Sequence, residues 1–381
     1  MSFGQPEASS ITCPDSLDGL LSLAYEKEAS DLFLKSGSSP VFKRLGKMES
    51  SGLAPLSEEK VQHLIYARLT PEQRTRFESD RELNLSYTSS SVTRIRQNIY
   101  NQRGSIATAC RLIPLEVPTL EELNIDSKAV LTLAKSHQGL VLVTGPTGSG
   151  KSTTLAAIIN LINSTRPVNI ITVEDPIEYV HKDKSGYVSQ REVGIDTTSF
   201  HEALKQMLRQ APDVILVGEL RDLATLDVAL QAAETGHLVF ATLHTSSASE
   251  TLDRISNMYA PHERAMLWLR LAVGLRGVIS QKLVVKKDGS GRKAAMEIMV
   301  TTPTISKQLE DGRSDDLYNA MRQDGEERYW GMQTMNQCLN QYHSDGIITE
   351  EEALRNCGNL AEIKQMLRKT SQESGKLPVA A

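Results

Sequence analysis

A glycine-rich stretch, residues 145–152, constrains the fold of this chain more than any other part of the sequence. It runs Gly-Pro-Thr-Gly-Ser-Gly-Lys-Ser and fits every fixed position of the pattern G-x-x-x-x-G-K-[ST]. The residues before it, 139–143, form a short apolar run that predicts a buried strand. After it, apolar residues spaced i, i+3, i+4 and i+7 predict one face of a helix, namely Leu155, Ile158, Ile159 and Ile162.

Strand, glycine loop and helix are together the arrangement in which this pattern binds phosphate groups. Glycines let consecutive backbone N–H groups turn inward around the phosphates, and the helix N-terminus adds a partial positive charge. A Gly/Ser loop that merely precedes a lysine is the alternative, which the flanking strand and helix disfavour. We predict that Lys151 reaches the β- and γ-phosphates of ATP and that Ser152 holds Mg²⁺. The predicted nucleotide-binding residues of this stretch are Gly145, Pro146, Thr147, Gly148, Ser149, Gly150, Lys151, Ser152 and Thr153.

Composition is that of an ordinary globular protein, with 40% hydrophobic and 23% charged residues. The length of 381 residues predicts two domains. A net charge of −5 and the lack of a dense Lys/Arg block disfavour nucleic acid as the main partner. The four cysteines lie far apart, which disfavours a zinc site and a disulfide framework and suits a reducing cytosol; they are Cys13, Cys110, Cys338 and Cys357.

Neither a membrane span nor a signal peptide is evident in the sequence. No apolar run reaches the ~18 residues of a spanning helix, and residues 1–6 lack the charged and apolar regions of a signal peptide. We therefore expect a cytoplasmic protein whose association with a membrane is peripheral.

The pattern of strands and helices divides the chain into successive regions. Residues 1–113 mix short helical and strand-like patterns and predict a small α+β domain, and two prolines make residues 114–125 an extended linker. In residues 126–300 strands and helices alternate, which implies an α/β domain with a mostly parallel sheet flanked by helices. Residues 301–368 are predicted to be helical, and residues 369–381 to be a disordered tail.

Acidic residues follow two of the predicted strands. The predicted strand 169–173 leads into Glu174, and the buried apolar strand predicted at 214–217 leads into Gly218 and Glu219. In doubly wound sheets the ligand binds at the carboxyl ends of the strands, and ATP hydrolysis needs Mg²⁺ and a carboxylate that orients or deprotonates the attacking water. We predict that Glu219 organises Mg²⁺ together with Ser152 and that Glu174 is the general base. Solvated loop carboxylates are the alternative.

Two histidines flank the predicted strand 238–243. His237 and His244 lie at its opposite ends, and their odd separation points them to opposite faces, so we do not expect them to share a metal ion. One of them is predicted to sense the γ-phosphate or a neighbouring subunit, with a purely structural role as the alternative. Candidate arginines for neutralising phosphate charge are Arg94, Arg96, Arg111, Arg209 and Arg221.

Several sequence boxes in a fixed order resemble the type IV pilus retraction ATPases (the PilT/PilU type), which are hexameric members of the secretion ATPase superfamily. The resemblance covers nearly the whole chain. Besides the glycine loop, the boxes are residues 29–34, 172–178, 208–213, 218–222, 235–238, 242–245 and 331–334.

This resemblance implies a RecA-like ATPase domain behind a PAS-like N-terminal domain, with a C-terminal helical region, assembled into a hexameric ring. It implies that Arg94, Arg96 and Arg111 reach the phosphates from the N-terminal domain. It also implies that ATP-driven domain rotations act on an inner-membrane platform protein and withdraw pilin subunits, which produces twitching motility. The predicted catalytic residues are Lys151, Glu174, Glu219, His237, His244, Arg209 and Arg221.

The chain departs from the family pattern at two places. Phe33 stands where many members have His, and residues 304–311 replace the family's A-I-R-N-L-I-R-E box, which is tied to retraction. An accessory or non-hydrolysing paralogue that joins a catalytic retraction ATPase therefore stays open, as does a type IV secretion or DNA-transfer ATPase. The four-cysteine metal motif of the assembly relatives is absent from the sequence, which disfavours pilus assembly.

Overall fold

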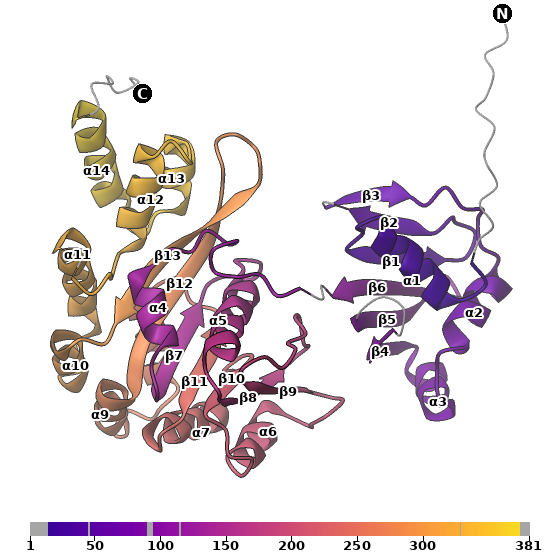
Figure 1. Cartoon of the computed structure of the whole chain (residues 1–381), viewed down its shortest axis with the longest axis horizontal. Helices are drawn as coiled ribbons and strands as arrows, with labels where there is room; N and C mark the ends of the chain where they lie inside the picture. Colours follow the sequence, from indigo (N-terminus) through magenta and orange to yellow (C-terminus); the bar gives the residue numbers. More distant parts are fainter. Residues whose placement is uncertain (1–13, 45, 90–93, 114–115, 328, 374–381) are drawn as a thin grey trace, which may run out of the picture. The chain divides into compact units, whose positions relative to one another are not determined.

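A computed structural model describes residues 14–373 of the chain except 45, 90–93, 114–115 and 328 (Figure 1). Cys13 and the first two residues of the predicted linker lie outside the described residues. Contacts divide the chain into two compact units. The first comprises the described residues up to Glu116 together with Glu178–Val180, and the second comprises Val117–Ile177 and the described residues from His181 onward.

The first unit is an α+β fold built on one antiparallel sheet of six strands, in the order β3-β2-β1-β6-β5-β4. Leucines of α1 and alternate residues of β1 and β5 form its buried core, so each strand turns one face toward the helices. Its elements are α1 (Leu17–Glu26), β1 (Asp31–Lys35), β2 (Val41–Arg44), β3 (Lys47–Ser50), α2 (Glu58–Tyr66), α3 (Pro71–Asp80), β4 (Glu82–Thr88), β5 (Arg94–Gln102) and β6 (Ser105–Ile113).

The second unit is built on a seven-stranded sheet in the order β13-β12-β7-β11-β10-β8-β9. Neighbouring strands are parallel except β12 and β13, which form an antiparallel hairpin. The sheet is mostly parallel, as predicted, and the four predicted apolar strands are confirmed. The strands are β7 (Gly139–Thr144), β8 (Asn169–Glu174), β9 (Tyr187–Glu192), β10 (Val214–Val217), β11 (Leu238–Leu243), β12 (Leu275–Val285) and β13 (Arg292–Val300).

Helices pack on this sheet and give the RecA-like arrangement of an α/β ATPase domain. The strands β7, β10 and β11 are buried along their whole length, which explains why their sequences are continuous apolar runs. The helices are α4 (Lys128–Ala134), α5 (Lys151–Thr165), α6 (Phe200–Met207), α7 (Leu223–Glu234), α8 (Ala248–Asn257) and α9 (Arg264–Gly274).

The C-terminal region is helical, and its last three helices lie beside the long β12–β13 hairpin (Figure 1). These three helices share a small core with Val284 and Ala295 of the hairpin. The predicted start of the tail at residue 369 is wrong, because α14 continues through Glu373. The elements are α10 (Pro303–Glu310), the 3₁₀ turn η1 (Ser314–Asp316), α11 (Leu317–Glu327), α12 (Met335–Ser344), α13 (Glu350–Asn356) and α14 (Leu360–Glu373).

None of the helices in the described ranges combines the length and the apolar character that crossing a membrane requires.

Candidate active site

The glycine loop, residues 145–150, connects the end of β7 to the start of α5. Gly145, Gly148 and Gly150 all have positive φ, at 147°, 79° and 86°, a region that residues with a side chain rarely adopt. A Cβ on Gly145 would lie 2.3 Å from the carbonyl oxygen of Gln281. At Gly148, in contrast, an added Cβ would meet no heavy atom of the described residues within 4 Å. The loop is therefore packed tightly on one side and open at Gly148.

Lys151, the first residue of α5, is buried and folded back on the loop. Its Nζ donates hydrogen bonds to the carbonyl oxygens of Gly145 at 2.7 Å and Pro146 at 3.1 Å. The buried Ser149 Oγ has no hydrogen-bond partner among the residues that the structure describes. A buried hydroxyl without a partner is costly, so Ser149 fits a loop that receives an oxygen-rich anion. Ser152 is exposed in the first turn of α5, where backbone N–H groups lack helical partners.

Four parallel strands end at the edge of the sheet that carries this loop. In the order β7, β11, β10, β8 they are followed or terminated by the glycine loop, His244, Glu219 and Glu174. The register pairs Thr144 with Leu243 and aligns the last residue of β10 with β8 and β11. The structure thus brings both predicted carboxylates and one predicted histidine to the same edge as the loop.

Charged side chains at this edge form a connected cluster around Glu219. Its Oε1 lies 3.1 Å from His244 Nε2, and its Oε2 accepts a 2.7 Å hydrogen bond from Arg221 Nε. Arg221 also reaches Asp175, with Nη1 3.3 Å from Oδ2. The hydrogen bond to Glu219 raises the pKa of Arg221 above its ordinary value, so the arginine remains a cation. Glu219 is held from two sides, which fixes the direction of its carboxylate.

Glu174 is fixed by two further side chains that the sequence did not single out as site residues. Thr172 Oγ1 donates to Glu174 Oε1 at 2.7 Å, and Gln190 Nε2 donates to the same oxygen at 3.1 Å. Gln281 of β12 was also missed, because it lies between Ser280 and Lys282, where no local pattern marks it. It is 2% exposed and hydrogen-bonds to Ser149 of the loop.

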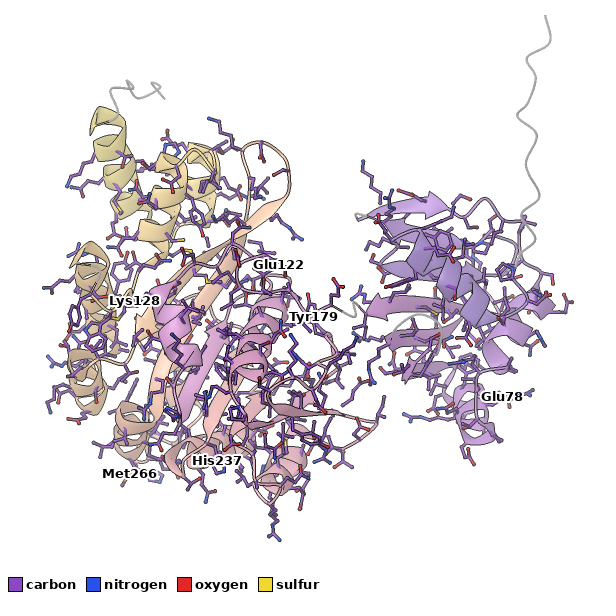
Figure 2. The ribbon with its side chains drawn as sticks, viewed as in Figure 1. Glu78, Glu122, Lys128, Tyr179, His237 and Met266 are labelled. Carbon is purple, nitrogen blue, oxygen red and sulfur yellow. The ribbon has the colours of Figure 1, made fainter. Side chains whose placement is uncertain are left out.

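Two predicted catalytic residues lie at the opposite edge of the sheet, and this corrects their assignment to the site. His237 immediately precedes β11 and lies low in Figure 2; its Nδ1 is 2.9 Å from the carbonyl oxygen of Ala232. Arg209 precedes β10 and is exposed. Parallel strands place all their amino ends at one edge, so neither residue reaches the loop within this unit.

The three predicted arginines of the first unit share one face of its sheet. Arg96 of β5 and Arg111 of β6 are cross-strand neighbours, and Arg94 lies two residues from Arg96. Arg111 Nε donates to Asp31 Oδ1 at 3.0 Å. Their role toward a nucleotide stays a prediction, since the glycine loop belongs to the second unit.

Two cavities of the second unit, of about 670 and 770 Å³, lie away from the glycine loop. Both are lined in part by residues 124–126, the first also by α12 and the second by α5. Neither cavity is lined by the glycine loop or by the charged residues at the carboxyl edge of the sheet. The case for a nucleotide site therefore rests on the conformation of the loop and on the side chains around it.

The fold and the site together indicate the class of protein, an ATPase. The model of the family "Type II/IV secretion system protein" matches residues 76–376. The chain is 44% identical over 334 residues to the type IV pilus retraction ATPase PilT of Pseudomonas aeruginosa, covering 88% of this chain and 96% of that one. It is 38% identical to the type IV pilus ATPase PilU of the same organism, covering 93% and 91% of the two chains.

A solved structure, that of the pilus retraction motor PilT with bound ADP, superposes with a TM-score of 0.85 at 39% identity. The match covers 92% of this chain and 99% of that one. This chain belongs to the type II/IV secretion ATPase family and, within it, to the pilus retraction ATPases, which confirms the resemblance drawn from the sequence boxes.

Proposed function

We propose that this chain is a Mg²⁺-dependent ATPase motor that assembles as a hexamer and drives retraction of type IV pili. One observation carries the proposal: the glycine loop, Glu174 and Glu219 all lie at the carboxyl edge of the parallel strands. The 44% identity to the retraction ATPase PilT, over 96% of its length, supports the biological role.

The loop residues bind the triphosphate. Backbone N–H groups of residues 147–152 would donate to the phosphate oxygens, and the hydroxyl of Ser149 would gain the partner that the described residues do not give it. On binding, Lys151 gives up its hydrogen bonds to the carbonyl oxygens of Gly145 and Pro146 and donates to the β- and γ-phosphates instead. Thr153 follows in the first turn of α5 and belongs to the same binding stretch. Ser152 and Glu219 are the residues that would hold Mg²⁺, which supplies positive charge to the β- and γ-phosphate oxygens.

Hydrolysis needs a base for water and positive charge for the departing ADP. Glu174 accepts a proton from water while the water oxygen bonds to the γ-phosphorus, and the bond between that phosphorus and the bridging oxygen breaks. Lys151 and Arg221 stabilise the negative charge on the phosphate oxygens. His244 holds Glu219 in place through the 3.1 Å contact.

The remaining parts of the proposal concern assembly. In a hexamer, Arg94, Arg96 and Arg111 would reach the phosphates from the N-terminal domain, and Arg209 and His237 would face a neighbouring subunit. The domain division at residues 1–113, 114–125, 126–300 and 301–368 belongs to the same proposal. So do peripheral attachment at the cytoplasmic face of the inner membrane and an inner-membrane platform protein as partner.

An accessory retraction ATPase is the second candidate. Its support is the 38% identity to PilU over 93% of this chain and the departure of residues 304–311 from the retraction box. Measuring ATP hydrolysis by the purified chain, alone and with a catalytic paralogue, separates the two. Turnover by the chain alone supports the motor, whereas turnover only in the mixture supports the accessory role.

The test of the catalytic proposal is Lys151→Ala in the full-length chain. We expect loss of ATP hydrolysis, measured as phosphate release, and failure to restore pilus retraction in a strain that lacks the gene. Lys184→Ala is the matched control, because Lys184 Nζ bonds to Asn160 Oδ1 at 2.6 Å outside the loop. Normal turnover by Lys151→Ala would overturn the assignment of the loop.

A further inference from the structure

One carboxylate oxygen of Glu174 accepts hydrogen bonds from two neighbouring side chains. Thr172 Oγ1 and Gln190 Nε2 both donate to Oε1, at 2.7 and 3.1 Å. Thr172 and Glu174 are two residues apart on β8 and so point to the same face of the sheet. Gln190 of β9 is the direct register partner of Thr172, which places its side chain on that face as well. Two side chains, one from β8 and one from β9, therefore converge on one oxygen atom of Glu174.

The orientation of the Gln190 amide follows from its other contact. Its Oε1 accepts a hydrogen bond from the backbone N–H of His181 at 2.8 Å. A backbone N–H can only donate, so the amide oxygen must face His181 and the amide nitrogen must face Glu174. Gln190 is thereby committed to donating to the carboxylate.

Two donors on one carboxylate oxygen restrict the rotation of the Glu174 side chain to the rotamer that keeps both hydrogen bonds. The carboxylate is therefore held in one direction, as a group that accepts a proton from a positioned water must be.

We infer that Thr172 and Gln190 are positioning residues for the hydrolytic step, which hold Glu174 in the orientation that it needs as the base that activates water. The inference rests on the proposed role of Glu174 as general base. During the reaction the proton passes from water to the Glu174 carboxylate, the water oxygen bonds to phosphorus, and ADP leaves. Thr172 and Gln190 donate hydrogen bonds throughout and neither gain nor lose a proton.

The sheet order separates this role from nucleotide binding. Glu174 and Gln190 lie on β8 and β9, at the side of the sheet away from β7 and its loop, with β10 and β11 between. Substitutions at Thr172 and Gln190 are therefore expected to lower kcat and to leave the KM for ATP nearly unchanged.

The test uses substitutions that remove a donor at constant shape. Thr172→Val replaces the buried hydroxyl by a methyl group, Thr172→Ser keeps the hydroxyl, and Gln190→Met removes the amide at similar length. We expect Thr172→Val and Gln190→Met to lower kcat by roughly tenfold to a hundredfold, a part of the 10²–10⁴-fold effect of a general base. Thr172→Ser should retain most of the activity. Equal activity of the Val and Ser variants would overturn the inference.

A purely structural role is separated by repeating both substitutions in a Glu174→Gln background. If Thr172 and Gln190 act through Glu174, they lower the residual hydrolysis no further there. A further fall of similar size would overturn the inference in favour of a general effect on the fold. If Glu174→Gln itself hydrolyses ATP at the wild-type rate, Glu174 is not the general base, and the proposed function is overturned at that point. If Glu174→Gln is inactive while Gln190→Met and Thr172→Val are fully active, only the present inference fails.

Discussion

Gln281 Nε2 donates a 2.7 Å hydrogen bond to the carbonyl oxygen of Ser149 in the glycine loop. Its Oε1 accepts from Thr154 Oγ1 at 2.8 Å, so one buried amide joins the loop to the first turn of α5. The neighbouring Ser280 pairs with Thr144 at the end of β7, with 2.9 Å between the hydroxyl oxygens. Strand β12 thus braces the loop at both of its ends.

Gln281→Leu should therefore weaken both the fold and nucleotide binding. The substitution leaves the Ser149 carbonyl and the Thr154 hydroxyl unpaired in a buried place, at about 1–3 kcal/mol for each unsatisfied group. For the two groups together, we expect the free energy of unfolding to fall by about 2–6 kcal/mol. We also expect ATP to bind at least about tenfold more weakly, because a less ordered loop must be ordered on binding.

Denaturant unfolding without nucleotide and titration with ATP measure the two effects of Gln281→Leu. Gln206→Leu is the control, since Gln206 is an exposed residue of α6. Equal ATP affinity of Gln281→Leu and the wild type would show that the hydrogen bonds of Gln281 do not order the loop.

The glycines of the loop should differ in their tolerance of alanine. Gly148 has a φ of 79°, and a Cβ added there would lie in open space. Alanine at this position should therefore cost only the free energy of holding a side-chain-bearing residue in the left-handed conformation, about 1–2 kcal/mol. Alanine at Gly145 would place its Cβ 2.3 Å from the Gln281 carbonyl, a backbone atom that cannot swing aside. In unfolding measurements without nucleotide, Gly145→Ala should lose clearly more stability than Gly148→Ala. The reverse order would contradict the close packing of the loop on β12.

The sequence was sufficient for the parts of the site that depend on local patterns. Glu174 and Glu219 each follow a predicted strand, and parallel strands place such residues at one edge by necessity. The same rule places His237 and Arg209 at the other edge, because each precedes its strand. The sequence already separated His237 from His244 along one strand, whereas Arg209 was assigned to the site without regard to its place before β10.

The supporting residues could not be predicted because they depend on strand pairing that is distant in sequence. Gln281 meets Ser149 only because β12 pairs with β7, although the two residues are 132 positions apart. Gln190 lies on β9, an edge strand whose partly exposed sequence Tyr-Val-Ser-Gln-Arg-Glu has no apolar run to mark it. Sheet order decides which residues become neighbours, and no local pattern encodes it.

The buried carboxyl group of Glu297 in β13 should make the free energy of unfolding depend on pH. It is 3% exposed, and its carboxylate accepts hydrogen bonds from the backbone N–H groups of Ala248 at 2.8 Å and Met335 at 3.4 Å, the first residues of α8 and α12. Burial raises its pKa above the ordinary value of 4.5, and the two N–H groups oppose this only in part. The folded state therefore holds the proton more tightly than the unfolded state does.

The consequence is that the contribution of Glu297 to the free energy of unfolding decreases as the pH rises above 4.5 toward the raised pKa. Glu297→Gln cannot ionise and should lose this dependence. Denaturant unfolding of both proteins between about pH 4 and pH 8 measures it, as the difference between their free energies at each pH. A difference that does not vary with pH would contradict the prediction.

Arg221 should matter for hydrolysis and hardly at all for stability. Its side chain is 54% exposed, with contacts to Glu219 and Asp175, and ion pairs this exposed contribute about 0–1 kcal/mol. Its charge, however, lies at the proposed phosphate site, where removing a preorganised cation raises the barrier to hydrolysis. We expect Arg221→Ala to lower kcat by at least about tenfold while changing the free energy of unfolding by less than about 1 kcal/mol.

Arg313→Ala is a close control for Arg221→Ala. Arg313 is 55% exposed and pairs with two carboxylates, Asp311 at 2.8 Å and Asp316 at 3.4 Å, between α10 and α11. Both variants remove one arginine with two exposed ion pairs, so their effects on unfolding should be alike. Their phosphate-release rates should differ, because only Arg221 contacts Glu219. If both variants hydrolyse ATP as the wild type does, the Arg221–Glu219 pair is a surface ion pair, and Arg221 is not needed to stabilise charge during hydrolysis.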